Sequence, residues 1–408
     1  MHILFLTDNF PPEVNAPASR TFEHCREWVK AGHQVTVITG APNFPKGKVF
    51  DGYQNRLWQQ EIMAGIRVIR VWTYITANEG FAKRTLDYMS YMVTGFMASM
   101  LVRRVDVVVG TSPQFFTVCA AYVVALFKRV PWVFELRDIW PESIRVVGAM
   151  KQSRLLDLLE KLEIFLYRKA SVIVSVTHAF RASLIRRGVD GDKIHVVTNG
   201  VDISRFSPRE KDAELLRQHG LQDKFVAGYI GTHGLAHALD TLLDAAKALK
   251  TLPDGNRFCI VLLGDGANKA ALRQRAQVEG LDNVIFIDSV PKDQVVRYWS
   301  ILDASIIHLK KNELFTTVIP SKLFECMGMA IPVLHGVQGE SAGIVEREEV
   351  GLLFEPENPQ ALINGLRLLA DDKKSLARFK ANGPKGGQRY DRSVLAAEML
   401  QILKKQIG

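Results

Sequence analysis

Short apolar runs rich in β-branched residues alternate with longer segments of helical periodicity along nearly all of the 408 residues. Residues 107–109 and 260–263 are apolar throughout, as expected of strands buried on both faces of a helix-covered parallel sheet. Between such runs, apolar residues recur at spacings of three and four, for example in 155–162 and 239–246. Alternation on this scale predicts doubly wound α/β units.

The alternation is interrupted once, around residues 200–224, where turn-forming pairs and mixed charges replace the apolar pattern. We therefore predict two Rossmann-like domains, residues 1–205 and 206–389, that face each other across a cleft. Because ligands of such sheets bind at the carboxyl ends of the strands, functional residues should follow strands. Strands are expected at 2–7, 34–39, 66–72, 106–109, 132–136, 171–176, 194–198, 225–230, 258–263, 284–288, 304–309 and 331–334.

Charge is unevenly distributed along the chain. The net charge is +9, and most of the excess lies in residues 1–200, in doublets such as Arg103-Arg104 and Lys128-Arg129. A basic half is compatible with an anionic membrane face, a phosphorylated substrate or nucleic acid. For any single doublet a solvated surface is the simpler interpretation, and no nucleic-acid partner is expected.

The cysteines and the first residues indicate the compartment. Cys25, Cys119, Cys259 and Cys326 are too few and too scattered for a disulfide framework or a zinc site. The first eight residues have no basic region and too short an apolar run for a signal peptide. No apolar stretch reaches the ~18 residues of a spanning helix. We expect a cytoplasmic protein with reduced thiols.

The segment from Pro320 to Gly328 is the best-defined candidate site. Proline at its start and glycine near its end bracket a short helix, whose N-terminus would hold phosphate. Lys322 adds a positive charge, and Glu325 lies three residues later on the same face. Pro320, Ser321 and Lys322 would thus meet a diphosphate, beside a carboxylate for two sugar hydroxyls. The alternative is a solvent-facing ion pair with a proline cap.

Two glycine-containing loops follow strands in the second half. Gly231-Thr232-His233-Gly234 follows 225–230, and Gly264-Asp265-Gly266 follows 258–263. Glycine lets the backbone approach a ligand closely, although each loop is also compatible with an ordinary strand-to-helix turn. The second loop lacks the third glycine of a dinucleotide fingerprint and is not in the first βα turn, so NAD is not indicated.

In the first half, Glu135 to Pro141 follows an apolar strand. Charges at the end of a buried strand are costly unless they line a site, so Arg137 and Asp138 are functional candidates. Asp190-Gly191-Asp192 has the form used to hold a divalent metal on a nucleotide sugar. It lies in a turn at the opposite end of the sheet, and we expect no metal site.

Residues 86–102 form an apolar, methionine-containing helical segment between the basic pairs Lys83-Arg84 and Arg103-Arg104. Two interpretations stay open. The segment is either a helix that rests on an anionic membrane or a core helix with adaptable methionine packing.

Together these motifs resemble the retaining family 4 glycosyltransferases of the GT-B fold, over nearly the full length of the chain. The branch that the chain resembles builds lipid-linked surface polysaccharides and includes the N-acetyl-L-fucosamine transferases. The residues that carry the resemblance lie in Asp8–Glu13, Ala18–Arg20, Glu135–Pro141, 199–202, 231–234 and Pro320–Glu325.

The resemblance implies roles for residues of the second domain. Glu325 would bind the nucleotide ribose as the second glutamate of a Glu-x7-Glu motif, although Thr317 stands in place of the first. Lys322 would supply the diphosphate charge that the family's usual Arg and Lys provide. The remaining donor contacts would come from Gly231, Thr232, His233, Gly264 and Asp265, with Val290 and Pro291 at the base.

The resemblance also implies roles for the first domain. Arg137 would assist at the diphosphate from this domain, and Asp138 would lie near the sugar. The segment with Glu13, Asn15 and Arg20 replaces a glycine-rich acceptor loop and would bind the acceptor. The tail 390–408 would cross back to the first domain.

The implied function is transfer of a sugar from a UDP-sugar to a polyprenyl-diphosphate-linked saccharide in O-antigen or capsule synthesis, with retention at the anomeric carbon. No cofactor and no metal are expected, because Lys322, Ser321 and the Gly231 loop would stabilise the departing diphosphate. The enzyme would work at the inner face of the cytoplasmic membrane. Two alternatives stay open: a GT-B epimerase or hydrolase that needs no acceptor, and a non-catalytic transferase-like partner, which Thr317 favours.

Overall fold

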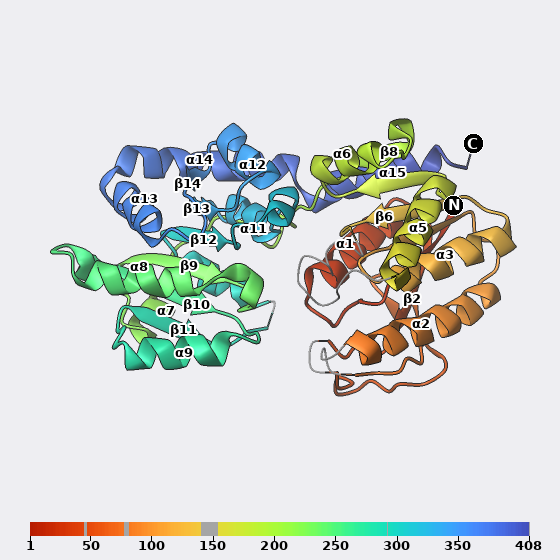
Figure 1. Ribbon diagram of the computed structural model, residues 1–408, viewed down its shortest axis with the longest axis horizontal. Helices are drawn as coiled ribbons and strands as arrows, with labels where there is room; N and C mark the ends of the chain where they lie inside the picture. Colours follow the sequence, from red (N-terminus) through yellow and green to blue (C-terminus); the bar gives the residue numbers. More distant parts are fainter. Residues whose placement is uncertain (45–46, 77–80, 140–153, 292, 408) are drawn as a thin grey trace. The chain divides into compact units, whose positions relative to one another are not determined.

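The computed structural model describes residues 1–44, 47–76, 81–139, 154–291 and 293–407. They form two compact units (Figure 1). The N-terminal unit comprises Met1–Thr198 and Arg392–Gly408, and the C-terminal unit comprises Asn199–Asp391. The sequence analysis placed the first boundary a few residues later, after residue 205. The difference arises because Val201 bridges to Asp391 within the C-terminal unit.

The N-terminal unit is built on an eight-stranded sheet of order β3-β4-β2-β1-β5-β6-β7-β8. All neighbouring strands are parallel except β3, which pairs antiparallel with β4 at the edge. The strands are β1 (His2–Leu6), β2 (Gln34–Gly40), β3 (Gln59–Met63), β4 (Ile66–Val71), β5 (Val107–Thr111), β6 (Trp132–Leu136), β7 (Val172–Ser175) and β8 (Ile194–Val196).

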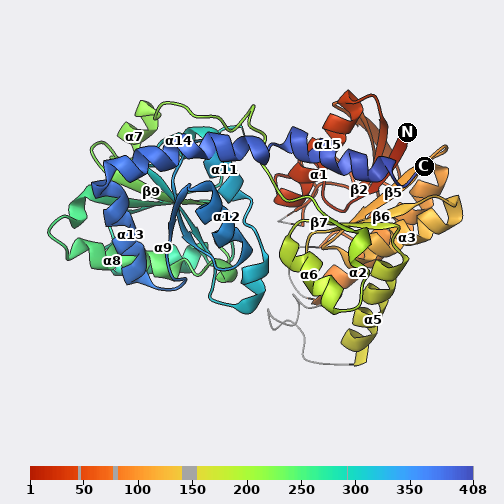
Figure 2. The same ribbon diagram turned by 90° about the horizontal axis from the view of Figure 1, so that it is seen from above.

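Helices cover both faces of this sheet (Figure 2). On one face lie α1 (Ala16–Lys30) and α15 (Arg392–Lys404), and on the other lie α2 (Phe81–Leu101), α3 (Phe115–Lys128), α5 (Arg154–Lys169) and α6 (His178–Arg186). The last helix packs on the first: Trp28 Nε1 donates to the Ala396 carbonyl at 2.8 Å, and Arg392 pairs with Glu23 at 2.8 Å. The chain therefore returns to complete the N-terminal unit.

The C-terminal unit contains a six-stranded parallel sheet of order β11-β10-β9-β12-β13-β14. The strands are β9 (Phe225–Ile230), β10 (Phe258–Leu263), β11 (Val284–Ile287), β12 (Ala304–His308), β13 (Val333–Gly336) and β14 (Gly351–Leu353). The first strand lies in the middle, with successive strands added to one side and then to the other. This is the Rossmann order, and it reverses between β9 and β12.

Two apolar clusters fill the space between this sheet and its helices. One cluster joins the sheet to α8 (Asp240–Lys250), α9 (Lys269–Val278) and α13 (Pro359–Asp371). The other joins it to α7 (Ala213–Gln218), α10 (Val295–Ser300), α11 (Lys322–Gly328) and α12 (Glu340–Glu348). The long helix α14 (Lys373–Arg389) packs on α11.

The sequence analysis missed two strands, β3 and β14. β3 alternates between half-buried and exposed positions and contains three glutamine and glutamate residues, so it lacks the apolar signal of the other strands. β14 has only three residues. The other strands lie at the expected positions, the four cysteines are free, and residues 190–193 form a turn with Asp190 as its cap.

Candidate functional site

The crevice at the carboxyl ends of β9 and β12 is where an open α/β sheet binds ligands, because the strand order reverses there. Two glycine loops, after β9 and after β10, meet at this edge. The Gly231 N–H donates to the Leu263 carbonyl at 2.9 Å, and the His233 N–H donates to the Asp265 carbonyl at 2.8 Å. The two candidate loops of the C-terminal unit are thus held against each other.

Glycine is required where these loops cross. Gly264 has φ +146°, and a Cβ there would lie 1.8 Å from the Gly231 carbonyl oxygen. Gly231 has the same φ, and its Cβ would lie 2.8 Å from Lys322 Nζ. Any side chain would separate the loops from each other or from the lysine.

Lys322 begins α11 and carries the most unusual environment of the site. Its Nζ lies 3.5 Å from the centroid of the Tyr229 ring, is buried, and finds no hydrogen-bond partner among the described residues. Burial lowers its pKa from 10.5 to about 7, partly opposed by the nearby Cys326 and Glu325. The solvent-facing ion pair considered for Lys322 is therefore not what the structure shows.

Two histidines share the Tyr229 ring with Lys322. The rings of His233 and His237 lie 6.0 Å and 5.7 Å from it. Burial, together with the nearby Lys322, lowers the pKa of each histidine to about 4. Both His233 ring nitrogens are buried and lack partners in the part of the chain that the structure describes. The three basic side chains are thus packed together with little positive charge in the absence of a ligand. Such a site could bind an anionic ligand, which would supply the missing counter-charge.

The other candidates for donor binding lie around this centre. Thr232 and Asp265 are exposed on the two loops, whereas Pro320, Ser321 and Glu325 are half-buried at α11. Val290 and Pro291 follow β11, the edge strand, with β10 between it and β9. Thr317 ends a 3-10 turn (Glu313–Thr317) and donates to the Leu314 carbonyl at 2.7 Å.

In the N-terminal unit, Arg20 is a structural residue. Its side chain is fully buried: Nε pairs with Glu135 at 2.8 Å, and the Nη atoms donate to the Thr198 and Val197 carbonyls at 2.6 and 3.0 Å. These bonds join α1, β6 and the segment after β8. A buried guanidinium whose three nitrogen atoms all donate within the framework does not fit the acceptor-binding role expected for Arg20.

Glu13 and Asn15 are also engaged in the framework. Glu13 is buried: one carboxylate oxygen accepts from the N–H groups of Asn43 and Phe44, both at 2.8 Å, and the other accepts from Asn9 at 3.0 Å. Asn15 caps α1 by accepting from the Ala18 N–H at 2.9 Å. Their expected contact with an acceptor would have to replace these bonds.

Arg137 and Asp138 follow β6, as expected. The backbone N–H of Arg137 donates to Ser112 Oγ at 2.8 Å, and its Nη1 donates to the Pro17 carbonyl at 3.2 Å. Burial lowers the pKa of Arg137 to about 9, Glu135 opposes this, and Arg20 reinforces it. Asp138 is half-buried. The rest of this motif, Trp140 and Pro141, lies outside the described residues.

Asp8 is a further candidate residue that the sequence reasoning did not single out. It follows β1, which is flanked by β2 on one side and β5 on the other, so it lies at the strand-order reversal of this sheet. Burial raises its pKa well above the usual value, and Asp87 and Glu13 add to the effect. The rule that ligands bind where the strand order reverses was the signal that would have found it.

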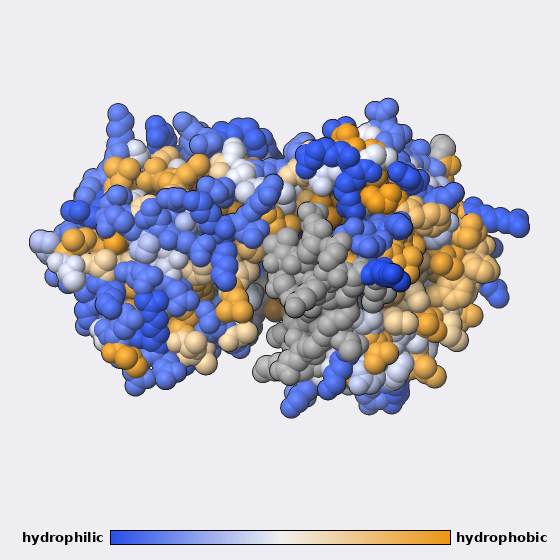
Figure 3. All heavy atoms as spheres, in the orientation of Figure 1, coloured by the Kyte–Doolittle hydropathy of each residue, from blue (hydrophilic) through white to orange (hydrophobic). Residues whose placement is uncertain are grey.

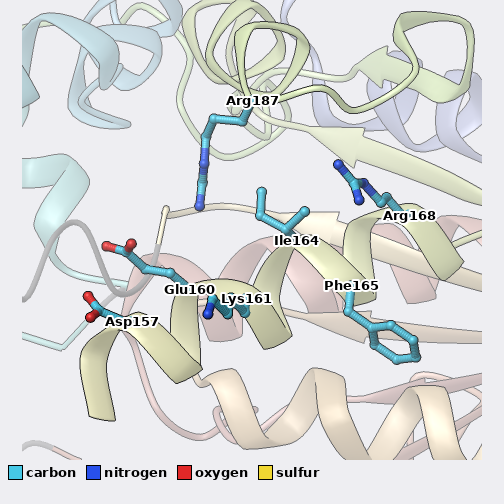
Figure 4. Close-up of a pocket in the computed structure, with 7 residues that line it drawn as sticks. All are labelled: Asp157, Glu160, Lys161, Ile164, Phe165, Arg168 and Arg187. Atoms are coloured by element: carbon cyan, nitrogen blue, oxygen red, sulfur yellow. The ribbon is translucent and has the colours of Figure 1, made fainter. Parts of the chain in front are cut away.

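A separate surface depression lies along α5 (Figure 4). It has a volume of about 700 Å³ and is lined by residues of α5 and by Arg187, which pairs with the buried Glu163 at 2.7 Å. Its lining mixes acidic, basic and apolar side chains. We assign it no function.

Two further candidate features are absent from the described part of the chain. There, no cluster of three or more histidine, cysteine or carboxylate side chains has the geometry to hold a metal ion. None of the helices that the structure describes combines the length and apolar character needed to cross a bilayer.

Comparison with known proteins agrees with this architecture. Residues 15–200 match the glycosyl transferase 4-like domain, and residues 211–386 match the glycosyl transferases group 1 domain. The protein is a family 4-like glycosyltransferase with the GT-B fold. Its sequence is 26% identical to that of WcaI, an Escherichia coli K12 glycosyl transferase assigned to colanic acid biosynthesis. The match covers 93% of this chain and 95% of WcaI.

Two other proteins extend the comparison. A GDP-mannose-dependent α-mannosyltransferase of Mycobacterium tuberculosis is 21% identical over 89% of this chain and 87% of its own. The structure of Anabaena HepE with UDP has a TM-score of 0.71 to the transferase at 17% identity, covering 99% of this chain and 100% of that one. The expected two-domain α/β fold and the enzyme class are confirmed.

Proposed function

We propose that this enzyme transfers a sugar from a UDP-sugar to a lipid-linked saccharide, with retention at the anomeric carbon, in the synthesis of a surface polysaccharide. The donor binds at the β9–β12 edge of the C-terminal unit, and the acceptor binds at the N-terminal unit. Arg137, Asp138 and Lys322 remain the candidates for catalysis.

The buried environment of Lys322 is the observation that most supports a donor site here. A buried amine without a hydrogen-bond partner destabilises the fold. Its presence here therefore supports a function in binding a ligand. At this edge a diphosphate would meet Lys322 Nζ and the backbone of the Gly231 loop. Its negative charge would favour the protonated amine, which then stabilises the departing diphosphate as the glycosidic bond breaks.

The choice of UDP is supported by HepE, whose structure holds UDP in the same fold. The mannosyltransferase relative uses GDP-mannose, so the base has to be tested directly. The relative assigned to colanic acid biosynthesis supports a surface polysaccharide as product. N-acetyl-L-fucosamine is the candidate sugar, and a polyprenyl-diphosphate saccharide is the candidate acceptor. The basic N-terminal half suits such an acceptor at the inner membrane face.

A thermal-shift panel with UDP, GDP and ADP tests the donor site. A ligand at a hundred times its dissociation constant stabilises by about 2.7 kcal/mol, or roughly 2–4 °C here. UDP should shift the wild type and the Lys374→Met control, an exposed lysine of α14, fully, and Lys322→Met at most about half as far. A shift with GDP alone would replace the proposed donor class. No shift with any nucleotide would favour a non-catalytic partner.

Turnover assays then separate transfer from its alternative. A radiolabelled UDP-sugar should release UDP only when a lipid-diphosphate saccharide is present, and the label should move to the lipid. Consumption of the donor at the same rate without acceptor would indicate an epimerase or hydrolase instead.

A further inference from the structure

The helix α2 has one buried face and one exposed apolar face. Tyr91 and Ser99 on the first are fully buried against the sheet. The second carries a line of apolar side chains at spacings of three and four, each 42–69% exposed: Leu86, Met89, Val93, Met97 and Leu101. Isolated exposed apolar residues are ordinary, but a continuous line of five is not. Neither interpretation of 86–102 from sequence was complete, because α2 packs on the core and still presents an apolar face.

The apolar surface continues onto the neighbouring helix α3. The Phe96 ring of α2 lies 5.6 Å from the Phe127 ring of α3, so the two helices meet here. Leu126 and Phe127 are 62% and 66% exposed. Figure 3 shows apolar side chains gathered on the side of this unit where α3 and the end of α2 lie. We call the exposed line on α2 together with Leu126 and Phe127 the α2/α3 face.

Basic side chains border the α2/α3 face. Arg103 and Arg104 follow the end of α2, Arg129 follows α3, and all three are exposed. Lys83 is exposed in the first turn of α2. Within the described ranges none of these four forms an ion pair, so their charge is available to a partner.

We propose that the α2/α3 face docks on the surface of an anionic phospholipid bilayer. Its apolar side chains would enter the boundary between headgroups and acyl chains, and the bordering arginines would meet lipid phosphates. A second copy of this chain is a poorer occupant, because a symmetric dimer through this face would bring the same basic residues together. The proposed function gives the docking its purpose, since a lipid-linked acceptor lies in the membrane. Vesicle binding itself requires neither nucleotide nor acceptor.

Vesicle flotation with the full-length protein tests the docking. Wild type should float with vesicles of phosphatidylethanolamine and phosphatidylglycerol, and much less with phosphatidylcholine alone. The double variant Val93→Glu/Met97→Glu should lower the vesicle-bound to free ratio more than about tenfold. Lys83→Ser/Arg103→Ser should lower it about tenfold at low salt, with a smaller loss at high salt.

The matched control places the same acidic substitutions on the other unit. Val278→Glu/Leu368→Glu changes two exposed residues, 81% and 51% accessible, at the end of α9 and on α13. This variant should float like the wild type. Equal flotation of the Val93/Met97 variant and the control would overturn the proposal, and so would a failure of the wild type to float.

Two further measurements separate this proposal from its alternatives. A concentration-dependent dimer in size-exclusion chromatography that Val93→Glu/Met97→Glu abolishes would identify a second copy as the occupant and overturn bilayer docking. The UDP-induced thermal shift should be unchanged in every variant. A wild type that does not float but keeps its UDP shift would refute only the docking, whereas a wild type that floats without any UDP shift would refute only the donor.

Discussion

Lys322 points its side-chain nitrogen at the Tyr229 ring, 3.5 Å from the centroid, and no carboxylate of the described residues pairs with it. An aromatic face stabilises a cation, but less than a counter-ion does in a buried place. The pair therefore holds a basic group that is ready to accept an anion.

Replacing Lys322 with methionine should separate binding from folding. Methionine fills a similar volume without a buried amine, so the free energy of unfolding should stay the same or rise. The affinity for UDP should fall by about 10–100-fold, the worth of a charged hydrogen bond. Calorimetric titration and urea unfolding measure the two quantities. A destabilised variant with normal UDP affinity would mean that the lysine is structural.

UDP binding should take up a proton above neutral pH. Free Lys322, with a pKa of about 7, is mostly neutral at pH 8.5, and the diphosphate favours the charged amine. UDP affinity should therefore weaken as pH rises from 7 to 9, by up to about tenfold per unit. Titrations at pH 8.5 in two buffers of different ionisation enthalpy report the proton directly. Lys322→Met should show no uptake, and equal enthalpies for the wild type would contradict the prediction.

The C-terminal unit should lose stability in mild acid through His335. Its ring is buried against Ser341, with Nε2 2.8 Å from the hydroxyl, and burial lowers its pKa to about 3. In the unfolded chain His335 binds a proton near pH 6.5, whereas in the folded protein it stays neutral down to about pH 3. The stability that depends on neutral His335 is therefore present above pH 6.5 and is lost as pH falls toward 3. The slope approaches about 1.4 kcal/mol per pH unit. Urea unfolding from pH 7 to 5 should show a smaller slope for His335→Gln.

Asp8→Asn should stabilise the N-terminal unit, by an amount that grows as pH rises. Burial beside Asp87 and Glu13 raises the pKa of Asp8, so the folded state prefers the protonated acid. Stability from this group is present below the unfolded value near 4 and lost as pH rises through the folded pKa. Asparagine mimics the protonated form. The variant should therefore gain more stability at pH 8 than at pH 5, with UDP affinity unchanged, and an equal effect at both pH values would exclude this ionisation.

Arg20→Met should destabilise the N-terminal unit by about 3–5 kcal/mol, because Glu135 would be left buried without its partner. Arg20→Met with Glu135→Gln should recover part of the loss. Chemical unfolding measures both, and UDP affinity should not change. A stable single variant with impaired transfer would restore the acceptor role expected from the sequence.

The fold was predictable because its signals are local. Each central strand is an apolar run, and each is separated from the next by a helix-length segment, so the strands, the two Rossmann-like units and the interruption near residue 200 could be read in order. β3 escaped because an edge strand with polar residues has no such run.

The candidate site was less predictable because its chemistry depends on distant partners. The sequence shows Arg20 as a charged residue after a proline-rich turn, but its partner Glu135 lies 115 residues away. Glu13 similarly has one carboxylate oxygen engaged by the backbone N–H groups of residues 43 and 44, about 30 residues further along the chain. Lys322 was recognised from its motif, yet only the structure shows that it faces an aromatic ring.

The return of α15 to α1 has a consequence for biosynthesis. The ribosome synthesises residues 199–391 before Ala396, whose carbonyl accepts a hydrogen bond from the Trp28 indole N–H. Until the whole C-terminal unit has been made and can fold, the N-terminal unit therefore lacks α15, and the apolar surface that α15 covers beside α1 is exposed. A nascent chain stalled before residue 392 should therefore expose this apolar surface to chaperones, and a circular permutant that begins with α15 should not.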